Sequence, residues 1–130
     1  MSGVLAADEL IDLAARILWT HAIGPQHVEC VLKITRSEAE ELIRIGRLAE
    51  PLGAARYERL LLFVNLLERL EHRLRHDSRA IRDALEAPLD ALGGSALADR
   101  LRGSLDELRG LRHAIEAIPT PKERWFRIGH

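Results

Sequence analysis

A proline followed closely by two glycines constrains the second half of this chain more than any other feature. Pro88 ends one helical segment, because its ring cannot continue the hydrogen-bond ladder and it forces Ala87 out of the helical conformation. Gly93 and Gly94 then permit a sharp backbone turn that side chains would block. Apolar residues at helical spacing flank this stretch. It therefore predicts a short helix that Ser78 caps, a fixed loop, a second short helix that Ser95 caps, and a longer helix that begins with a capping box of Ser104 and Glu107.

The leucines around this turn follow a defined spacing with the proline and the glycines. The residues concerned are Leu85, Pro88, Leu92, Gly93, Gly94, Leu97 and Leu101. This pattern resembles the toxin-binding domain of the Xre/MbcA/ParS antitoxins, which usually carries Trp-Leu-x-x-Pro-Asn-x-x-Leu-Gly-Gly and then a leucine-rich helix. The chain departs from that pattern with Ala84 in place of the tryptophan and Leu89 in place of the asparagine.

This resemblance implies the antitoxin of a type II toxin–antitoxin pair. The usual partner of the family is a RES-domain toxin, an enzyme that consumes NAD, and the antitoxin would block access to the NAD pocket. We expect the loop and the arginine and aromatic side chains near the C-terminus to bind the toxin, because such side chains commonly anchor protein interfaces. The expected toxin-binding residues are Pro88, Leu92, Gly93, Gly94, Arg124, Trp125 and Phe126.

The N-terminal part predicts a module similar to a helix-turn-helix. An amphipathic helix is expected over 8–21, with Trp19 widening its apolar face. A short helix over 25–33 and a further helix, begun by a capping box of Ser37 and Glu40, then flank a tight turn. The antitoxin family also carries a helix-turn-helix before its toxin-binding domain, so the order of the segments fits the resemblance.

The second helix of this pair holds the candidates for contact with operator DNA. They are Thr35, Arg36, Ser37 and Arg44. The same helix is acidic, and carboxylates near phosphates are repelled, whereas base-reading helices more often present Arg, Asn, Gln or Ser. The pair of helices is therefore either a DNA-binding module or a dimerisation or scaffold module.

Pro51 and Gly53 mark the clearest internal boundary. A long helix is expected over 54–76, and its segment 60–67 is apolar on nearly every side. Such a helix is normally buried all round, so we expect it to be the central core helix and also to pack against a second subunit in a homodimer.

Basic residues gather in two places. Five arginines lie between Arg69 and Arg82 against Glu71 and Asp77, which is typical of a solvated helix face or of a surface for phosphate or an acidic partner. The tail over 119–130 mixes basic and aromatic residues. It either folds back onto its own core or inserts into a partner.

Composition and motifs narrow the class of protein. At 130 residues, 47% hydrophobic and 30% charged, the chain suits a soluble globular protein of one domain, or of one domain with a small appended module. The absence of a secretory segment or a long apolar run predicts a cytoplasmic protein with no membrane partner. The net charge of −1 does not by itself require nucleic acid. The single Cys30 excludes an internal disulfide and is most simply a small buried apolar residue.

The sequence lacks the usual motifs of catalytic, phosphate-binding and metal-binding sites. There is no phosphate-binding glycine loop and no recognisable pair of nucleophile and base. His72 and His76 share a helix face, but the flanking arginines disfavour a cation. We therefore expect no enzyme activity, no cofactor and no metal.

These features together predict an all-α protein. It would be a helical bundle with a helix-turn-helix-like module over 1–50, a central helix and helical toxin-binding domain over 51–118, and an interaction tail over 119–130. The expected function is that of an antitoxin which could also repress its own operon. Two alternatives remain: a stand-alone helix-turn-helix transcription regulator that also uses the Arg69–Arg82 face on DNA, and a helical dimer that only scaffolds a partner.

Overall fold

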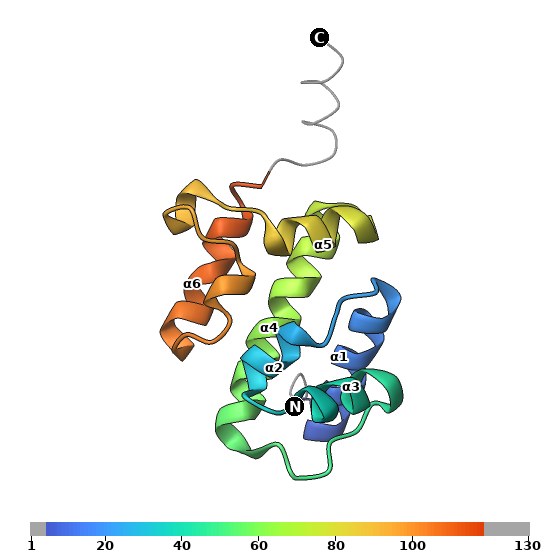
Figure 1. Ribbon diagram of the computed structural model, residues 1–130. Helices are drawn as coiled ribbons and strands as arrows, with labels where there is room; N and C mark the ends of the chain where they lie inside the picture. Colours follow the sequence, from blue (N-terminus) through green and yellow to red (C-terminus); the bar gives the residue numbers. More distant parts are fainter. Residues whose placement is uncertain (1–4, 119–130) are drawn as a thin grey trace. The chain divides into compact units, whose positions relative to one another are not determined.

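The computed structural model describes residues 5–118, and this part of the chain contains helices and turns but no strand (Figure 1). The α-helices are α1 (Ala7–Thr20), α2 (Gln26–Leu32), α3 (Arg36–Ile45), α4 (Gly53–Arg73), α5 (Ser78–Glu86) and α6 (Leu105–Ile115). Two single-turn 3-10 helices, η1 (Asp90–Leu92) and η2 (Ala98–Arg100), lie between α5 and α6. The prediction of an all-α fold is thus confirmed. The chain divides into two compact units, unit 1 (Met1–Asn65) and unit 2 (Leu66–His130).

Unit 1 is built around the apolar faces of α1 and α3, which pack against each other. Leu10 and Leu18 of α1 and Ala39 and Leu42 of α3 are completely buried, and each helix repeats its buried residues at helical spacing. Trp19, in contrast, is 70% exposed. The expectation that it widens the apolar face of α1 is wrong, because one residue beyond Leu18 is a rotation of about 100° away from the buried stripe.

The turn between α2 and α3 covers residues 33–35. Lys33 ends α2 in the left-handed conformation, with φ 55° and ψ 51°, and a side chain makes that conformation costly. Thr35 caps α3: its hydroxyl accepts a hydrogen bond from the Glu38 amide at 3.1 Å, and the Glu38 carboxylate accepts one from the Thr35 amide at 3.0 Å. These bonds lower the pKa of Glu38, the backbone contact contributing most, so the cap is intact at neutral pH.

The capping box that we expected at Ser37 and Glu40 is therefore wrong. α3 begins at Arg36, and Ser37 lies inside its first turn. Thr35 with Glu38 satisfies the same sequence rule two residues earlier. The other end of α3 follows its sequence signal, since Gly46 ends the helix with φ 70°.

Two arginines of α4 hold the C-terminal end of α2 within unit 1. Arg56 Nε donates to the Leu32 carbonyl at 3.0 Å, and Arg59 Nε donates to the Val31 carbonyl at 2.5 Å. The last carbonyls of a helix have no partner inside the helix, so these side chains supply the missing donors. Arg59 is only 8% exposed, and burial lowers its pKa. The guanidinium still keeps its charge, because the ordinary pKa of arginine lies far above neutral pH.

In unit 2, η2 contacts both α5 and α6. Leu97 and Leu101, which flank η2, are completely buried, as are Ile81 and Leu85 of α5. The second short helix expected after the loop is only a single 3-10 turn, which lies between the buried Leu97 and Leu101.

In unit 2, the observed N-cap of α6 agrees with the prediction, whereas that of α5 differs from it. Ser104 and Glu107 form the capping box of α6, with exchanged bonds of 3.2 and 3.0 Å. At α5 the cap is Asp77, whose carboxylate accepts from the Ala80 amide at 3.0 Å. The expectation that Ser78 caps this helix is wrong, because the adjacent Asp77 already satisfies the first-turn donor.

The start of α3 can be tested by two matched substitutions. Thr35→Ala should lower the free energy of unfolding by about 1 kcal/mol, because it removes the side-chain acceptor of an N-cap. Ser37→Ala should change it by less than about 0.5 kcal/mol, because this exposed hydroxyl lies within the helix. Urea unfolding followed by circular dichroism measures both values. A larger loss for Ser37→Ala than for Thr35→Ala would contradict the observed helix start.

Candidate interaction surfaces

The Gly-Gly loop, residues 88–95 of unit 2, is closed by its own backbone. The Leu89 amide donates to the Ser95 carbonyl at 3.0 Å, and the Gly94 amide donates back to the Leu89 carbonyl at 2.9 Å. The Leu92 amide donates to the same Leu89 carbonyl at 3.0 Å. These bonds hold the loop in one conformation.

The backbone angles explain the residues of this loop. Ala87, before the proline, is extended with φ −79° and ψ 136°, as the proline predicts. Gly93 and Gly94 both have positive φ, 67° and 92°. A Cβ at either glycine would have no heavy atom within 4 Å. Backbone conformation, and not lack of space, therefore requires glycine at these two positions.

The loop presents backbone, small side chains and the exposed carboxylate of Asp90. Pro88, Ala91, Gly93 and Gly94 are exposed, whereas Leu92 is half-buried. Of the expected toxin-binding residues, the structure thus brings Pro88, Leu92, Gly93 and Gly94 together in one loop. The others, Arg124, Trp125 and Phe126, lie outside the described residues.

The segment after the loop is held by an arginine and an aspartate. Arg100 Nη2 donates to the Leu92 carbonyl at 2.8 Å, and the Asp99 carboxylate accepts from the Ala96 amide at 2.9 Å. The expectation that Ser95 caps the next helix is wrong, because η2 follows Leu97 and has no side-chain N-cap. Sequence reasoning missed Arg100, since nothing in its neighbours signals a contact with a carbonyl of the loop.

The candidate DNA-contacting residues on α3 are only partly available. The hydroxyl of Thr35 is engaged in the helix cap, and the Arg36 guanidinium forms an ion pair with Glu29 of α2. Ser37 and Arg44 are exposed, and Glu40 is exposed with them. The accessible surface of α3 therefore mixes charges of both signs.

The arginines between Arg69 and Arg82 do not act as one group. Arg73 is half-buried and donates to the backbone carbonyls of Glu116 and Ile118. Arg69, Arg75 and Arg79 are exposed.

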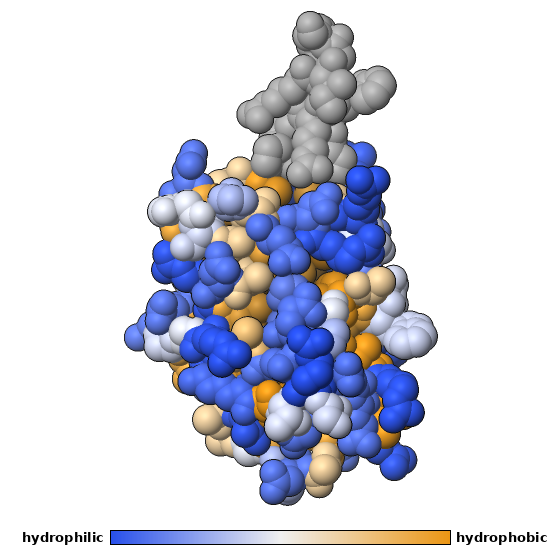
Figure 2. All heavy atoms as spheres, in the orientation of Figure 1, coloured by the Kyte–Doolittle hydropathy of each residue, from blue (hydrophilic) through white to orange (hydrophobic). Residues whose placement is uncertain are grey.

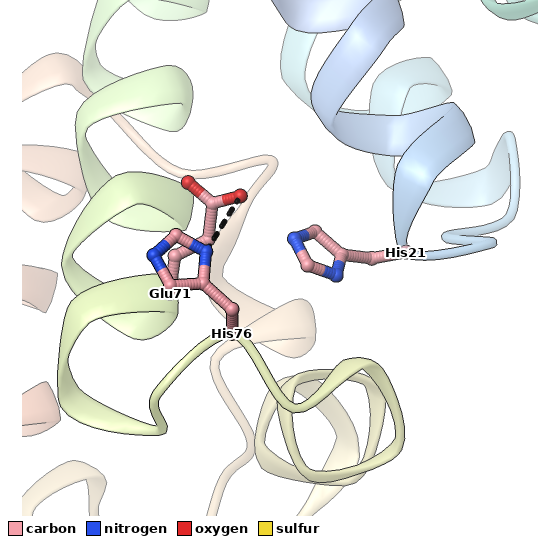
Figure 3. Close-up of side chains that lie close together, drawn as sticks. All are labelled: His21, Glu71 and His76. Atoms are coloured by element: carbon pink, nitrogen blue, oxygen red, sulfur yellow. Dashed lines mark ion pairs between the residues drawn. The ribbon is translucent and has the colours of Figure 1, made fainter.

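The histidines of this stretch also differ from each other. Both His72 and His76 are exposed, and His76 Nδ1 lies 3.8 Å from a carboxylate oxygen of Glu71 (Figure 3). That contact is an ion pair only when the imidazole is protonated. Arg75 and His76 connect α4 to α5 in the left-handed conformation, with φ 54° and 60°.

Cys30 of α2 is half-buried. It is therefore more exposed than the buried apolar residue that the sequence predicts at this position.

Hydrophilic side chains predominate on the face of the molecule drawn in Figure 2, with smaller apolar areas between them. None of the helices described over 5–118 combines the length and the apolar character needed to cross a membrane. No family model, curated protein or solved structure matches the chain.

The conformational role of the glycine pair can be tested against a glycine inside a helix. Gly94→Ala should lower the free energy of unfolding by about 1–2 kcal/mol, because alanine is strained at positive φ. Gly110→Ala should raise it by about 1 kcal/mol, because Gly110 lies exposed within α6 and alanine favours a helix. No neighbour lies within 4 Å of a new Cβ at either position. Opposite signs in urea unfolding are thus expected from the same chemical change, and equal effects would disprove the explanation.

Proposed function

We propose that this protein is the antitoxin of a type II toxin–antitoxin pair, which binds a RES-domain toxin and blocks access to its NAD pocket. The observation that carries the proposal is the Gly-Gly loop. Its exposed Pro88, Gly93 and Gly94 stand at the positions that match the antitoxin pattern, and both glycines need the backbone freedom that the pattern supplies.

A preformed loop is well suited to occlusion. Its conformation is already fixed by hydrogen bonds from Leu89 and Gly94, so little conformational entropy is lost when a partner binds. Small exposed residues let the partner approach the backbone closely. The side chains of Arg124, Trp125 and Phe126 would add the larger anchors that an interface of this kind needs. An antitoxin that covers a pocket requires no catalytic group, cofactor or metal of its own.

Repression of the operon is the second part of the proposal. It rests on the tight turn between α2 and α3 and on the exposed Ser37 and Arg44, which a phosphate backbone can reach. Because Glu40 is exposed on the same helix, affinity for DNA through α3 would be modest and would depend on the partner complex.

We also propose that the chain forms a homodimer. The half-buried Leu61 and Leu62 of α4 leave apolar surface for a second copy. Light scattering over a range of concentrations gives the mass, and a mass of one chain throughout would exclude the dimer.

The toxin-binding surface can be tested with a substitution that adds bulk and charge to the loop. Ala91→Arg should weaken binding to a cognate RES-domain toxin by at least about tenfold and restore NAD consumption in the mixture, because Ala91 is exposed in the middle of the loop. The matched control is Ala54→Arg on α4 in unit 1, where the alanine is also exposed. It should leave binding within about twofold.

Calorimetry and an NAD-consumption assay measure the two effects. If the toxin is active alone and the wild-type chain neither binds nor inhibits it, the antitoxin proposal fails. Equal losses for Ala91→Arg and Ala54→Arg would place the interface elsewhere on the chain.

A stand-alone regulator is the second candidate function. Its support is the exposure of Arg69, Arg75 and Arg79 on and between α4 and α5. These guanidinium groups are accessible to phosphate, unlike that of Arg73.

That candidate predicts DNA binding without any toxin. Three phosphate contacts should give a slope of about −3 for the logarithm of affinity against the logarithm of salt concentration. Arg79→Met should reduce the slope by about 0.9, and Arg112→Met, an exposed arginine of α6, should leave it unchanged. Fluorescence anisotropy with a labelled duplex measures both. Affinity that does not change with salt would rule out this candidate.

A further inference from the structure

The backbone carbonyls of the Gly-Gly loop fall into two groups. Those that accept a hydrogen bond inside unit 2 belong to Leu89, Asp90, Leu92 and Ser95. The carbonyls of Ala91, Gly93 and Gly94 accept none from the part of the chain that the structure describes. All three residues are exposed, and the exposed surface of a glycine is backbone alone. The loop therefore presents free carbonyl acceptors to its surroundings.

The amides of the same loop are largely used. Each amide from Leu92 to Ser95 donates to a carbonyl of the loop. Only the amides of Asp90 and Ala91 lack an acceptor among the residues described over 5–118. The glycine end of the loop thus offers acceptors without backbone donors.

Asp90 adds a charged acceptor to this end. Its side chain is exposed and makes no hydrogen bond or ion pair with the described residues. The Gly93 amide donates to the Asp90 carbonyl at 3.0 Å, so the two residues lie within one turn. The guanidinium of Arg100 does not neutralise the carboxylate by pairing with it, because its Nη2 donates to the Leu92 carbonyl. We call the Asp90 carboxylate and the free carbonyls of Ala91, Gly93 and Gly94 the acceptor surface.

A partner that covers the acceptor surface has to supply donors. A carbonyl removed from water without a donor costs free energy, and a carboxylate costs more. The arginine side chain carries five N–H donors and no acceptor, and it forms strong hydrogen bonds to carboxylates. Its flat guanidinium can also reach backbone where small residues leave the approach open. No heavy atom lies within 4 Å of the position a Cβ would take at Gly93 or Gly94.

We propose that the Gly-Gly loop receives an arginine side chain of the partner protein, whose guanidinium donates to the Asp90 carboxylate and to the free carbonyls of the loop. This inference rests on the proposed function, since the arginine would belong to the toxin. It adds the chemistry of the contact to the position of the interface.

A series of substitutions at Ala91 separates charge from bulk. Ala91→Glu, Ala91→Gln and Ala91→Arg add side chains of similar length at one exposed position. Affinity for the toxin should fall in that order, with Ala91→Glu at least about tenfold tighter than Ala91→Arg, because only the arginine repels a cation. The difference should shrink as salt is raised. Equal affinities, or the reverse order, would show that the loop does not receive a cation.

Asp90→Asn tests the charged member of the acceptor surface. It should weaken toxin binding about tenfold, because it replaces an ionised acceptor with a neutral one of the same shape. Asp83→Asn, which removes the same charge from an exposed position of α5, should stay within about twofold. Circular dichroism shows that both variants are folded before calorimetry compares their affinities. Equal losses for the two variants would reduce the effect to net charge and overturn the inference.

A probe without the toxin keeps the inference apart from the proposed function. A capped tri-arginine peptide, titrated into the full chain, should shift the amide NMR signals of Gly93 and Gly94 to saturation. A capped tri-glutamate peptide should not, and Asp90→Asn should weaken the arginine response at least about threefold. If the wild-type chain binds no toxin, the antitoxin proposal fails and this titration alone decides the inference. Signals of the two glycines that do not move with tri-arginine would then reject it.

Discussion

Hydrogen bonds from arginine to backbone carbonyls at the ends of short helices are the interaction on which both units depend. In unit 1, Arg56 and Arg59 hold the last carbonyls of α2, and Arg59 does so while almost completely buried. In unit 2, Arg100 holds the carbonyl at the end of η1. A helix as short as α2 has few internal bonds in proportion to its unpaired ends, so its stability comes from outside the helix. A bond from a charged donor contributes about 1.5–3 kcal/mol, comparable with the loss from leaving a buried carbonyl unpaired.

This use of arginine accounts for part of an unusual composition. All but two of the 19 basic residues are arginine. Lysine at position 59 would put a compact, strongly hydrated charge into a buried site, and it would lose its proton more readily there. The guanidinium is more weakly hydrated and presents several donors in one plane, so it tolerates burial beside the carbonyls. An arginine count alone is therefore poor evidence for nucleic-acid binding in this chain, because several arginines serve the fold.

Local signals in the sequence predicted some of the helix ends and misplaced others. Pro88, the two glycines of the loop and the capping box at Ser104 were read correctly, because each depends on only a few neighbouring residues. The start of α3 was misread because two overlapping segments satisfy the same capping rule. The structure shows that Thr35 and Glu38 exchange the capping bonds, so the helix begins at the earlier of the two segments.

The sequence could not predict the long-range contacts that hold the candidate interaction surfaces in place. The Arg59 contact joins residues 28 positions apart, and the contact of Arg73 with Ile118 joins residues 45 apart. No rule of sequence spacing links residues so far apart. Without knowledge of its partner, an arginine on a helix is interpreted as a solvent-exposed residue. The exposure of Trp19 was missed for a related reason. The prediction put Trp19 on the buried face of α1 because the residue is hydrophobic. Its angular position about the helix axis puts it on the exposed side.

The residues available for recognition differ in kind between the two units. In unit 1, two of the four candidate DNA contacts on α3 are committed to other partners: the Thr35 hydroxyl to the helix cap and the Arg36 guanidinium to Glu29. In unit 2, the Gly-Gly loop uses backbone bonds to hold itself, and its exposed residues are engaged in none of them through their side chains. A surface whose conformation is set by the backbone keeps its shape when its side chains meet a partner. Contact with a partner through this loop would leave its backbone bonds in place, whereas contact through the start of α3 would compete with the bonds that Thr35 and Arg36 already make.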